Sequence, residues 1–396
     1  MLAYKTEHID NSEILRNAKK WNKNKLITDQ NYETIKSKYA NPLYTPNLFI
    51  RIGLFIFTFI SAFAAIGLLM LVTNFSGSQS GFRIHCIVDG IILLALLELL
   101  VKGKELYKSG IDDALLYMVV GSLVTGFCLL FYNNDLGDST SMIVNCFIAL
   151  PFLILFSIRY SDMLLAAVTF VCAFLLIFLL VSKTGESSKY SMPFIVMILS
   201  TALYLVLLKF RKLTQFRFWD SSLWILEILS LLIFYLAGNY FVVRTMSEEL
   251  FGLELNVGED IPFAFFFYTY TAIVPLVYIF LGLKDKNKVL LQSGLILVVV
   301  SVATFKYYYS LGHQEITLTI SGIVMIVVAW LSIRYLKVPK FGITYIEDMN
   351  ENTVENFDAE ALLTAQTFLN TQSQPGNNTT EFGGGKFGGG GADSSF

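Results

Sequence analysis

The chain has 396 residues, of which 55% are hydrophobic and only 15% are charged, and its mean hydropathy is +0.59. A soluble domain carries about 25% charged residues, so this composition excludes an ordinary soluble protein. The net charge of −2 provides no field that would attract nucleic acid, and we expect no such partner. The four cysteines show no C-x-x-C spacing, so we predict no metal site, no disulfide framework and no cofactor.

The first 47 residues are polar and show no cleavable signal peptide. An apolar stripe predicts one helix over residues 12–24, and Thr28 is a good N-cap for a second. Two prolines, Pro42 and Pro46, end this pattern before the first apolar block. We therefore predict that residues 1–47 form a cytoplasmic segment of two short helices.

Residues 48–336 contain apolar blocks near the roughly 20 residues that a helix needs to cross a membrane. Lipid offers no hydrogen-bond partner to the backbone, so each block predicts a helix. The predicted spans cover residues 48–73, 84–101, 113–132, 142–158, 163–181, 192–208, 221–243, 263–283, 289–309 and 316–336. The fourth and sixth are short. The expected fold class is all-α, a polytopic transmembrane bundle of about ten spans in a lipid bilayer.

The loops between the spans predict the orientation of the chain. With the N-terminus inside, the inner loops carry eleven Lys and Arg residues and the outer loops carry four. Basic residues favour the cytoplasmic side, so this bias places both termini in the cytoplasm. Residues 337–396 would then be a cytoplasmic tail, which is acidic from Phe341 onward. After Gln374 it is rich in Gly and Ser, and this composition predicts disorder.

Two carboxylates within the apolar blocks are candidate coupling residues, because ionisable groups inside a bilayer are costly. Glu98 lies near the inner end of the second span, and Glu227 lies about two turns into the seventh. Both are at inner-leaflet depth, so they could face one polar cavity and exchange a proton or bind a cation. The alternative is structural pairing, of Glu98 with Lys102 four residues later. For Glu227, the alternative is a structural position on the same helical face as Asp220, seven residues earlier, and near Arg217.

Pro151 and Pro275 fall inside the fourth and eighth predicted spans. Proline removes a backbone donor and can free a carbonyl group for a ligand, as in the broken helices of transporters. A plain helix kink is the alternative. Asp89 lies toward the outer end of the second span, where it would cap a helix face near water.

The motifs of several enzyme classes are missing from the sequence. There is no G-x-S-x-G, no H-E-x-x-H and no P-loop. The histidines are His8, His85 and His313, and we expect none to pair inside the membrane with a serine or an aspartate. We therefore predict no catalytic residue and no enzyme activity.

The N-terminal pattern has Trp21, the run Leu26-Ile27-Thr28-Asp29-Gln30, and then Ile35 and Tyr39, with membrane spans directly after it. It resembles a family of bacterial predicted membrane proteins of unknown function that carry a two-helix cytoplasmic segment ahead of many spans. The Gly-rich end, from Phe382 to Phe396, is similar to endings of other bacterial membrane proteins. Both resemblances imply a multi-pass protein of the bacterial cytoplasmic membrane, and neither implies an activity.

Two functions follow from these patterns. The first is a carrier of a small solute or an ion such as a proton, using intramembrane carboxylates and kinked helices. The second is a membrane anchor or regulatory protein that recruits protein partners through residues 1–47 or 371–396. A third, an intramembrane enzyme, lacks any nucleophile–base pair.

Overall fold

The computed structural model describes residues 2–73, 79–131, 137–185, 187–249 and 260–308, together with six isolated helical positions between 319 and 334. Side chains are described throughout these ranges except at 79–80, 187–190 and 306–308. The predicted tenth span, 316–336, and the tail, 337–396, lie outside the described residues apart from those positions. The described chain is helical, with one isolated bridge between Tyr44 and Leu106 as its sole β pairing.

Nine helical segments in the described ranges are long and apolar enough to cross a membrane, so the chain is an all-α, membrane-embedded protein. The long helices are α3 (Leu48–Thr73), α4 (Gln79–Lys104), α5 (Ile111–Leu130), α6 (Asp138–Tyr160), α7 (Met163–Ser182), α8 (Ser187–Arg211), α9 (Asp220–Gly238), α11 (Ala264–Lys284) and α12 (Lys288–Tyr308). A 3₁₀ turn, η2 (Thr214–Trp219), leads into α9, and α10 (Tyr240–Glu249) follows it.

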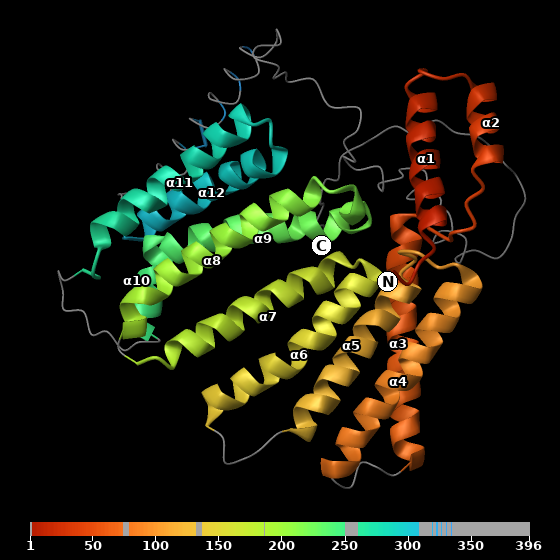
Figure 1. Cartoon of the computed structure of the whole chain (residues 1–396), viewed down its shortest axis with the longest axis horizontal. Helices are drawn as coiled ribbons and strands as arrows, with labels where there is room; N and C mark the ends of the chain where they lie inside the picture. The colour runs from red at the N-terminus through yellow and green to blue at the C-terminus, as the bar shows by residue number, and fades with distance from the viewer. Residues whose placement is uncertain are drawn as a thin grey trace, which may run out of the picture.

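The long helices form two groups that meet at α7 (Figure 1). In the first bundle, α3 to α7, the pairs α4–α5 and α6–α7 are closely packed hairpins, and α5 lies between α3 and α6. In the second bundle, α8 to α12, the hairpins are α8–α9 and α11–α12, and α9 contacts both α11 and α12. Helix α7 joins the bundles by packing on α8 and α9.

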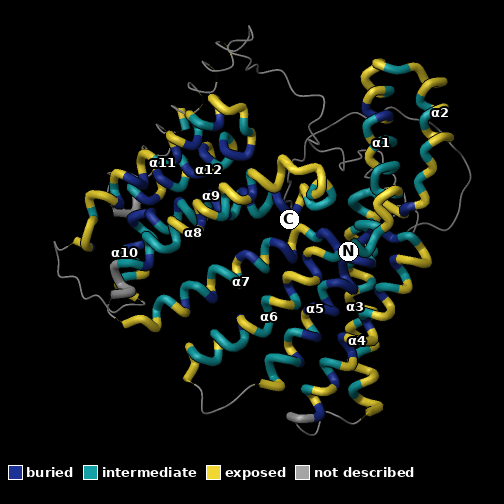
Figure 2. The backbone as a smooth tube through the Cα atoms, in the orientation of Figure 1, coloured by how far each residue is buried: buried dark blue, intermediate teal, exposed yellow. Residues whose placement is uncertain are grey.

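The outer surface of these bundles is apolar, and Figure 2 shows the exposure of α3, none of whose residues is buried. Its side chains Phe57 and Leu71 are 69% and 75% exposed. A soluble protein rarely exposes a continuous apolar surface of this length. The surface therefore fits contact with lipid, which agrees with the apolar composition of the chain.

The N-terminal helices α1 (Thr6–Lys23) and α2 (Asp29–Lys38) form a hairpin that projects from one end of the first bundle (Figure 1). This hairpin and the described residues before it are here called the head. Thr28 caps α2 as predicted, since its hydroxyl accepts a hydrogen bond from the backbone N–H of Asn31 at 3.2 Å. Helix α1 begins six residues before the predicted start at residue 12, because polar residues continue its first turns.

Three helices differ from the predicted spans. Helices α6 and α8, predicted as short spans, have 23 and 25 residues. Polar residues at their ends continue each helix beyond the apolar block. A prediction from hydropathy leaves these polar residues out. The seventh span, predicted as continuous over 221–243, is interrupted at Asn239 between α9 and α10.

Candidate functional site

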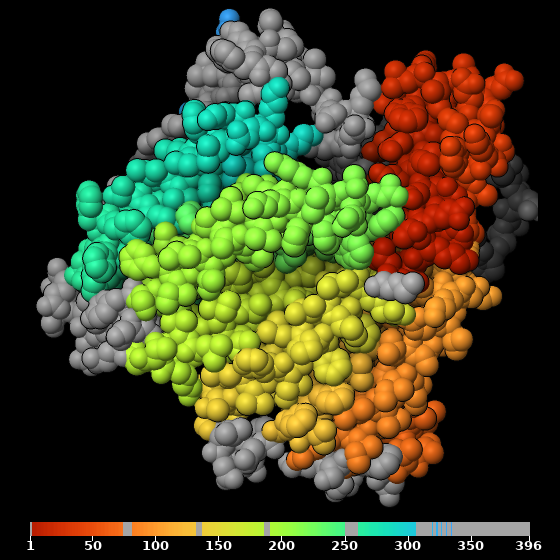
Figure 3. Space-filling view, in the orientation of Figure 1, coloured from red at the N-terminus to blue at the C-terminus, as the bar shows by residue number. Residues whose placement is uncertain are grey.

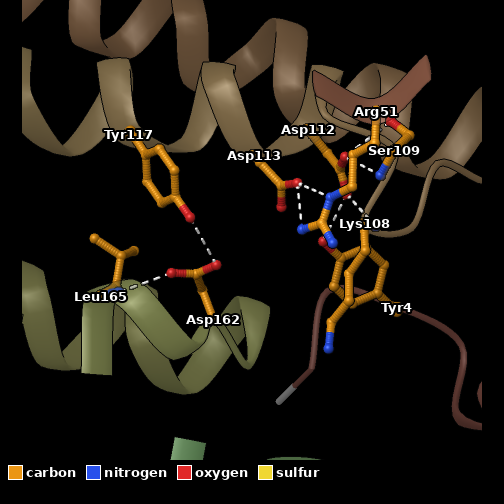
Figure 4. Close-up of polar contacts among 9 residues, drawn as sticks. All are labelled: Tyr4, Arg51, Lys108, Ser109, Asp112, Asp113, Tyr117, Asp162 and Leu165. Carbon is orange, nitrogen blue, oxygen red and sulfur yellow. Dashed lines mark hydrogen bonds and ion pairs between the residues drawn. The ribbon is translucent and has the colours of Figure 1, made fainter. Parts of the chain in front are cut away.

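A buried polar cluster lies where the first turns of α3 and α5 meet (Figure 4). The Arg51 guanidinium donates from Nε and Nη2 to Asp113 Oδ2 at 2.9 and 2.7 Å, which ties α3 to α5. The neighbouring Asp112 accepts from the backbone N–H groups of Lys108 and Ser109, both at 2.8 Å. These bonds close the turn before α5 and give acceptors to two N–H groups that lie outside any helix.

A third carboxylate, Asp162, lies across from this turn (Figure 4). It caps α7 by accepting from the Leu165 N–H at 2.7 Å, and it accepts from the Tyr117 hydroxyl at 3.1 Å. Burial, followed by the positive charge of Arg51, lowers the pKa of the Lys108 ammonium in the same cluster. The cluster is a network of satisfied hydrogen bonds that fixes helix ends.

The head is fastened to this cluster and to both bundles. The Tyr4 hydroxyl donates to Asp112 at 3.2 Å, and Lys5 pairs with Glu105, just after α4, at 3.2 Å. Asp10 in α1 pairs with Arg217 in η2 at 2.6 Å. Figure 3 shows the head packed against segments of both bundles. The head therefore bridges the two bundles at one end of the molecule.

The first predicted coupling residue, Glu98, lies in an ionic network. Its Oε1 accepts from Arg159 Nη2 at 2.6 Å and from the Tyr160 hydroxyl at 2.7 Å. Its Oε2 lies 3.0 Å from Lys102 Nζ, the partner that helical spacing suggested. The sequence did not indicate Arg159, because that contact joins α4 to α6 over 61 residues.

The second predicted coupling residue, Glu227, is fully buried in the second bundle. Its Oε2 accepts from Arg211 Nη1 at 2.6 Å, and its Oε1 accepts from Asn287 Nδ2 at 3.2 Å. Arg217, suggested from sequence as its neighbour, instead contacts Asp10 in the head. Glu98 and Glu227 lie in different bundles and share no partner, so the structure does not bring them together.

The break between α9 and α10 is a single residue, Asn239, which is 1% exposed and has an extended backbone with φ −72° and ψ 125°. Its amide Nδ2 donates to the Tyr235 hydroxyl and to Thr304 Oγ1, both at 3.1 Å. The backbone N–H of Tyr240 donates to Thr271 Oγ1 at 2.9 Å. The break leaves the Tyr240 N–H without a helical acceptor, and a side chain of α11 satisfies it. Side chains of α9 and α12 hold the Asn239 amide.

Pro275 in α11 adds a further polar group beside the break at Asn239. It has no N–H, so the carbonyl oxygen of Thr271, four residues earlier, has no helical donor. That oxygen accepts instead from Ser301 Oγ at 2.9 Å and from the Tyr235 hydroxyl at 3.4 Å. We name the five buried residues Tyr235, Asn239, Thr271, Ser301 and Thr304 the oxygen cluster. Pro151, the other predicted kink residue, is exposed on α6.

One expectation from the sequence is wrong: a membrane-embedded histidine does pair with an aspartate. His85 Nε2 lies 3.1 Å from Asp89 Oδ2 within α4, and both side chains are buried. Asp89 is therefore not a cap near water. The spacing of four residues places the two side chains on one helical face, and this signal was readable in the sequence.

An apolar cavity of about 320 Å³ lies between α7, α8, α9 and α10. Phe174, Leu175, Pro193 and Met246 are among its lining residues. A lining of this kind suits a hydrocarbon chain better than a polar solute. Pro193, inside α8, is a further helix proline that the sequence reasoning did not single out.

No protein-family model matches the chain, no curated protein matches its sequence, and no solved structure matches its fold.

Proposed function

We propose that the protein is a membrane carrier of a small solute or ion. The observation that carries this proposal is the break at Asn239 beside the carbonyl oxygen of Thr271 that Pro275 frees. Irregular backbone at membrane depth is tolerated where it is buried in protein or lines a cavity, and carriers build their binding sites from such broken helices. Thr271 lies seven residues into α11, or about 10 Å from its start, so the oxygen cluster is within the span.

The chemistry of the oxygen cluster indicates the class of solute. Its five side chains carry no formal charge, and they present hydroxyl, amide and carbonyl groups. Such groups fit a monovalent cation or a small neutral molecule with hydroxyl or amide groups. A ligand would replace the hydrogen bonds that Ser301 and Tyr235 now make to Thr271.

The substitution Pro275→Ala tests the proposal. Alanine restores an N–H that can bond to the Thr271 carbonyl oxygen within α11, so this oxygen is no longer available to a ligand. We expect the fold to be kept. Uptake of radioactive sodium ions, rubidium ions or a mixture of labelled amino acids into proteoliposomes should fall about fivefold or more, since each net hydrogen bond contributes about 1 kcal/mol.

Pro151→Ala is the matched control, because it makes the same change at an exposed helix proline. It should leave uptake at the wild-type rate. Wild-type proteoliposomes that take up none of the probes faster than protein-free liposomes would count against a carrier of these solutes. Equal uptake by wild type and Pro275→Ala would count against the oxygen cluster as its site.

A second function, recruitment of a protein partner, is supported by the shape of the head. The head is tied to both bundles, yet α2 has no buried residue, and Trp21 and Leu26 at the hairpin tip are 44% and 58% exposed. Aromatic side chains at such positions are common in interfaces. Deleting residues 371–396, the other proposed recruiting segment, should leave uptake intact in a carrier and abolish partner binding in a recruiter.

We also propose that the protein lies in a bacterial cytoplasmic membrane with both termini inside, and that it is related to the bacterial family that its N-terminal pattern resembles. The bias of basic residues supports the orientation. A reporter enzyme fused after Phe396 tests it. Activity of a reporter that works only in the cytoplasm is expected, and activity of one that works only outside would overturn the orientation.

A further inference from the structure

The pair formed by His85 and Asp89 lies inside the membrane region of the first bundle. The two residues are one turn apart on α4, with His85 Nε2 at 3.1 Å from Asp89 Oδ2, and their side chains are 5% and 3% exposed. Asp89 lies ten residues into α4, or about 15 Å from its first residue. The head is at the opposite end of this helix, where Glu105 contacts Lys5.

Close packing of α4 on α5 encloses this stretch. A Cβ atom on Gly90 would lie 2.7 Å from Leu123 Cδ2, and one on Gly126 would lie 2.6 Å from Ile87 Cγ1. Real Cβ atoms do not approach so closely, so the two glycines allow the helices to meet next to the pair. Both titratable side chains are thereby covered by protein.

The charge of the pair depends on one proton. With a neutral imidazole and an ionised carboxylate it carries −1, and with one added proton it is neutral overall. A net charge buried at low dielectric is costly, so the proton removes a penalty of burial. In addition, Asp89 Oδ1 is buried and accepts no hydrogen bond from any described residue.

The described residues place two further titratable groups near the pair, both on α4. On α4 the neighbouring titratable groups are Arg83, two residues before His85, and Cys86, which is close to Asp89. Helix α5, the element packed on this stretch, contributes Leu123 and Gly126 there.

We infer that His85 and Asp89 form a proton-binding site in the half of the first bundle that is remote from the head. The site takes one proton from water onto His85 Nε2, where the Asp89 carboxylate stabilises the imidazolium, and no other bond changes. A role for this proton as the coupling ion rests on the proposed carrier function, whereas its binding does not.

Nuclear magnetic resonance of the full chain in lipid nanodiscs, labelled with ¹⁵N-histidine, tests the inference. The chain has three histidines, and His85→Gln identifies the signal of interest. Between about pH 5 and about pH 9 that signal should change from imidazolium to neutral imidazole in the wild type. Asp89→Asn should reduce the proton affinity of His85 about tenfold or more, which moves the midpoint down by about one pH unit.

Cys86→Ser is the control, since it changes the neighbouring titratable group and should leave the midpoint in place. A wild-type His85 signal that stays in one protonation state over the whole range would overturn the inference without need of any variant. An unchanged midpoint in Asp89→Asn would also overturn it. Neither result depends on uptake, so the proton site and the Pro275→Ala assay can fail separately.

Discussion

The guanidinium of Arg211 donates to Glu227 Oε2 at 2.6 Å, and this carboxylate is fully buried while the arginine side chain is 30% exposed. The pair joins α8 to α9, and Asn287 in the turn before α12 completes it. A buried ion pair of this kind is costly to break from one side, because the remaining charge has no adequate partner. The folded protein need not be more stable with this ion pair than with two apolar residues of similar volume in its place.

The first prediction follows from that asymmetry. Arg211→Ala should lower the free energy of unfolding by about 3–5 kcal/mol, because it leaves Glu227 charged and buried. The double variant Arg211→Met with Glu227→Leu should recover most of that loss. Urea unfolding in detergent micelles measures both, with Lys209→Ala, an exposed position on the same helix, as the control. A loss below about 1 kcal/mol for Arg211→Ala would mean that Glu227 is solvated.

A second prediction concerns two helix glycines. A Cβ on Gly238 would lie 2.4 Å from Tyr270 Cε1, whereas one on Gly121 would meet nothing within 4 Å. Gly238→Ala should cost about 1–3 kcal/mol through overpacking beside the break at Asn239. Gly121→Ala should be neutral, or stabilising by up to about 1 kcal/mol. Thermal unfolding in detergent measures the pair, and equal effects of the two changes would contradict the close approach of α9 and α11.

The third prediction tests the turn before α5. Asp112 accepts hydrogen bonds from two backbone N–H groups, the Ser109 hydroxyl and Tyr4, so Asp112→Ala should cost about 2–4 kcal/mol. Asp220→Ala removes a carboxylate that is 63% exposed and pairs only at the surface, and it should change the stability by less than about 1 kcal/mol. Chemical unfolding of both variants in one detergent gives the comparison. Similar losses would show that the network around Asp112 adds little.

The spans could be predicted because a membrane helix is defined by the length of an apolar block, which a sequence displays directly. Helix ends were less accurate, as in α6 and α8, because flanking polar residues continue a helix without changing the hydropathy. The break at Asn239 was missed for a related reason. The sequence stays apolar from Tyr240 to Val243, so the block looks continuous, while the contact that ends the helix comes from Thr271 on α11.

In the candidate site, contacts within one helix could be predicted from the sequence, and contacts between helices could not. Contacts along one helix, such as Glu98 with Lys102, could be predicted from spacing. The same spacing of four residues indicates the contact of His85 with Asp89. The partners Arg159 and Arg211 lie on other helices, and only the packing of the bundles brings them to their carboxylates. A single sequence does not determine such packing by periodicity alone.

The last prediction is a pH dependence of head docking. Burial, and after it the charges of Asp112 and Asp113, raise the pKa of Tyr4 well above its ordinary value of about 10. In the undocked head Tyr4 ionises near that ordinary value, while in the docked head it remains a neutral donor to Asp112. The contribution of Tyr4 to docking is therefore complete below about pH 10 and is lost as the pH rises through the raised value.

Head docking should consequently weaken above about pH 10, and Tyr4→Phe, which cannot ionise, should remove this part of the dependence. Below that pH the variant should dock slightly less well, by about 0.5–1.5 kcal/mol, because one hydrogen bond is missing. The rate at which an alkaline-active protease cleaves the head from the full chain measures docking. Tyr44→Phe, at a tyrosine that is 46% exposed, is the control for general alkaline effects. If wild type and Tyr4→Phe lose the head in parallel as the pH rises, Tyr4 does not hold it.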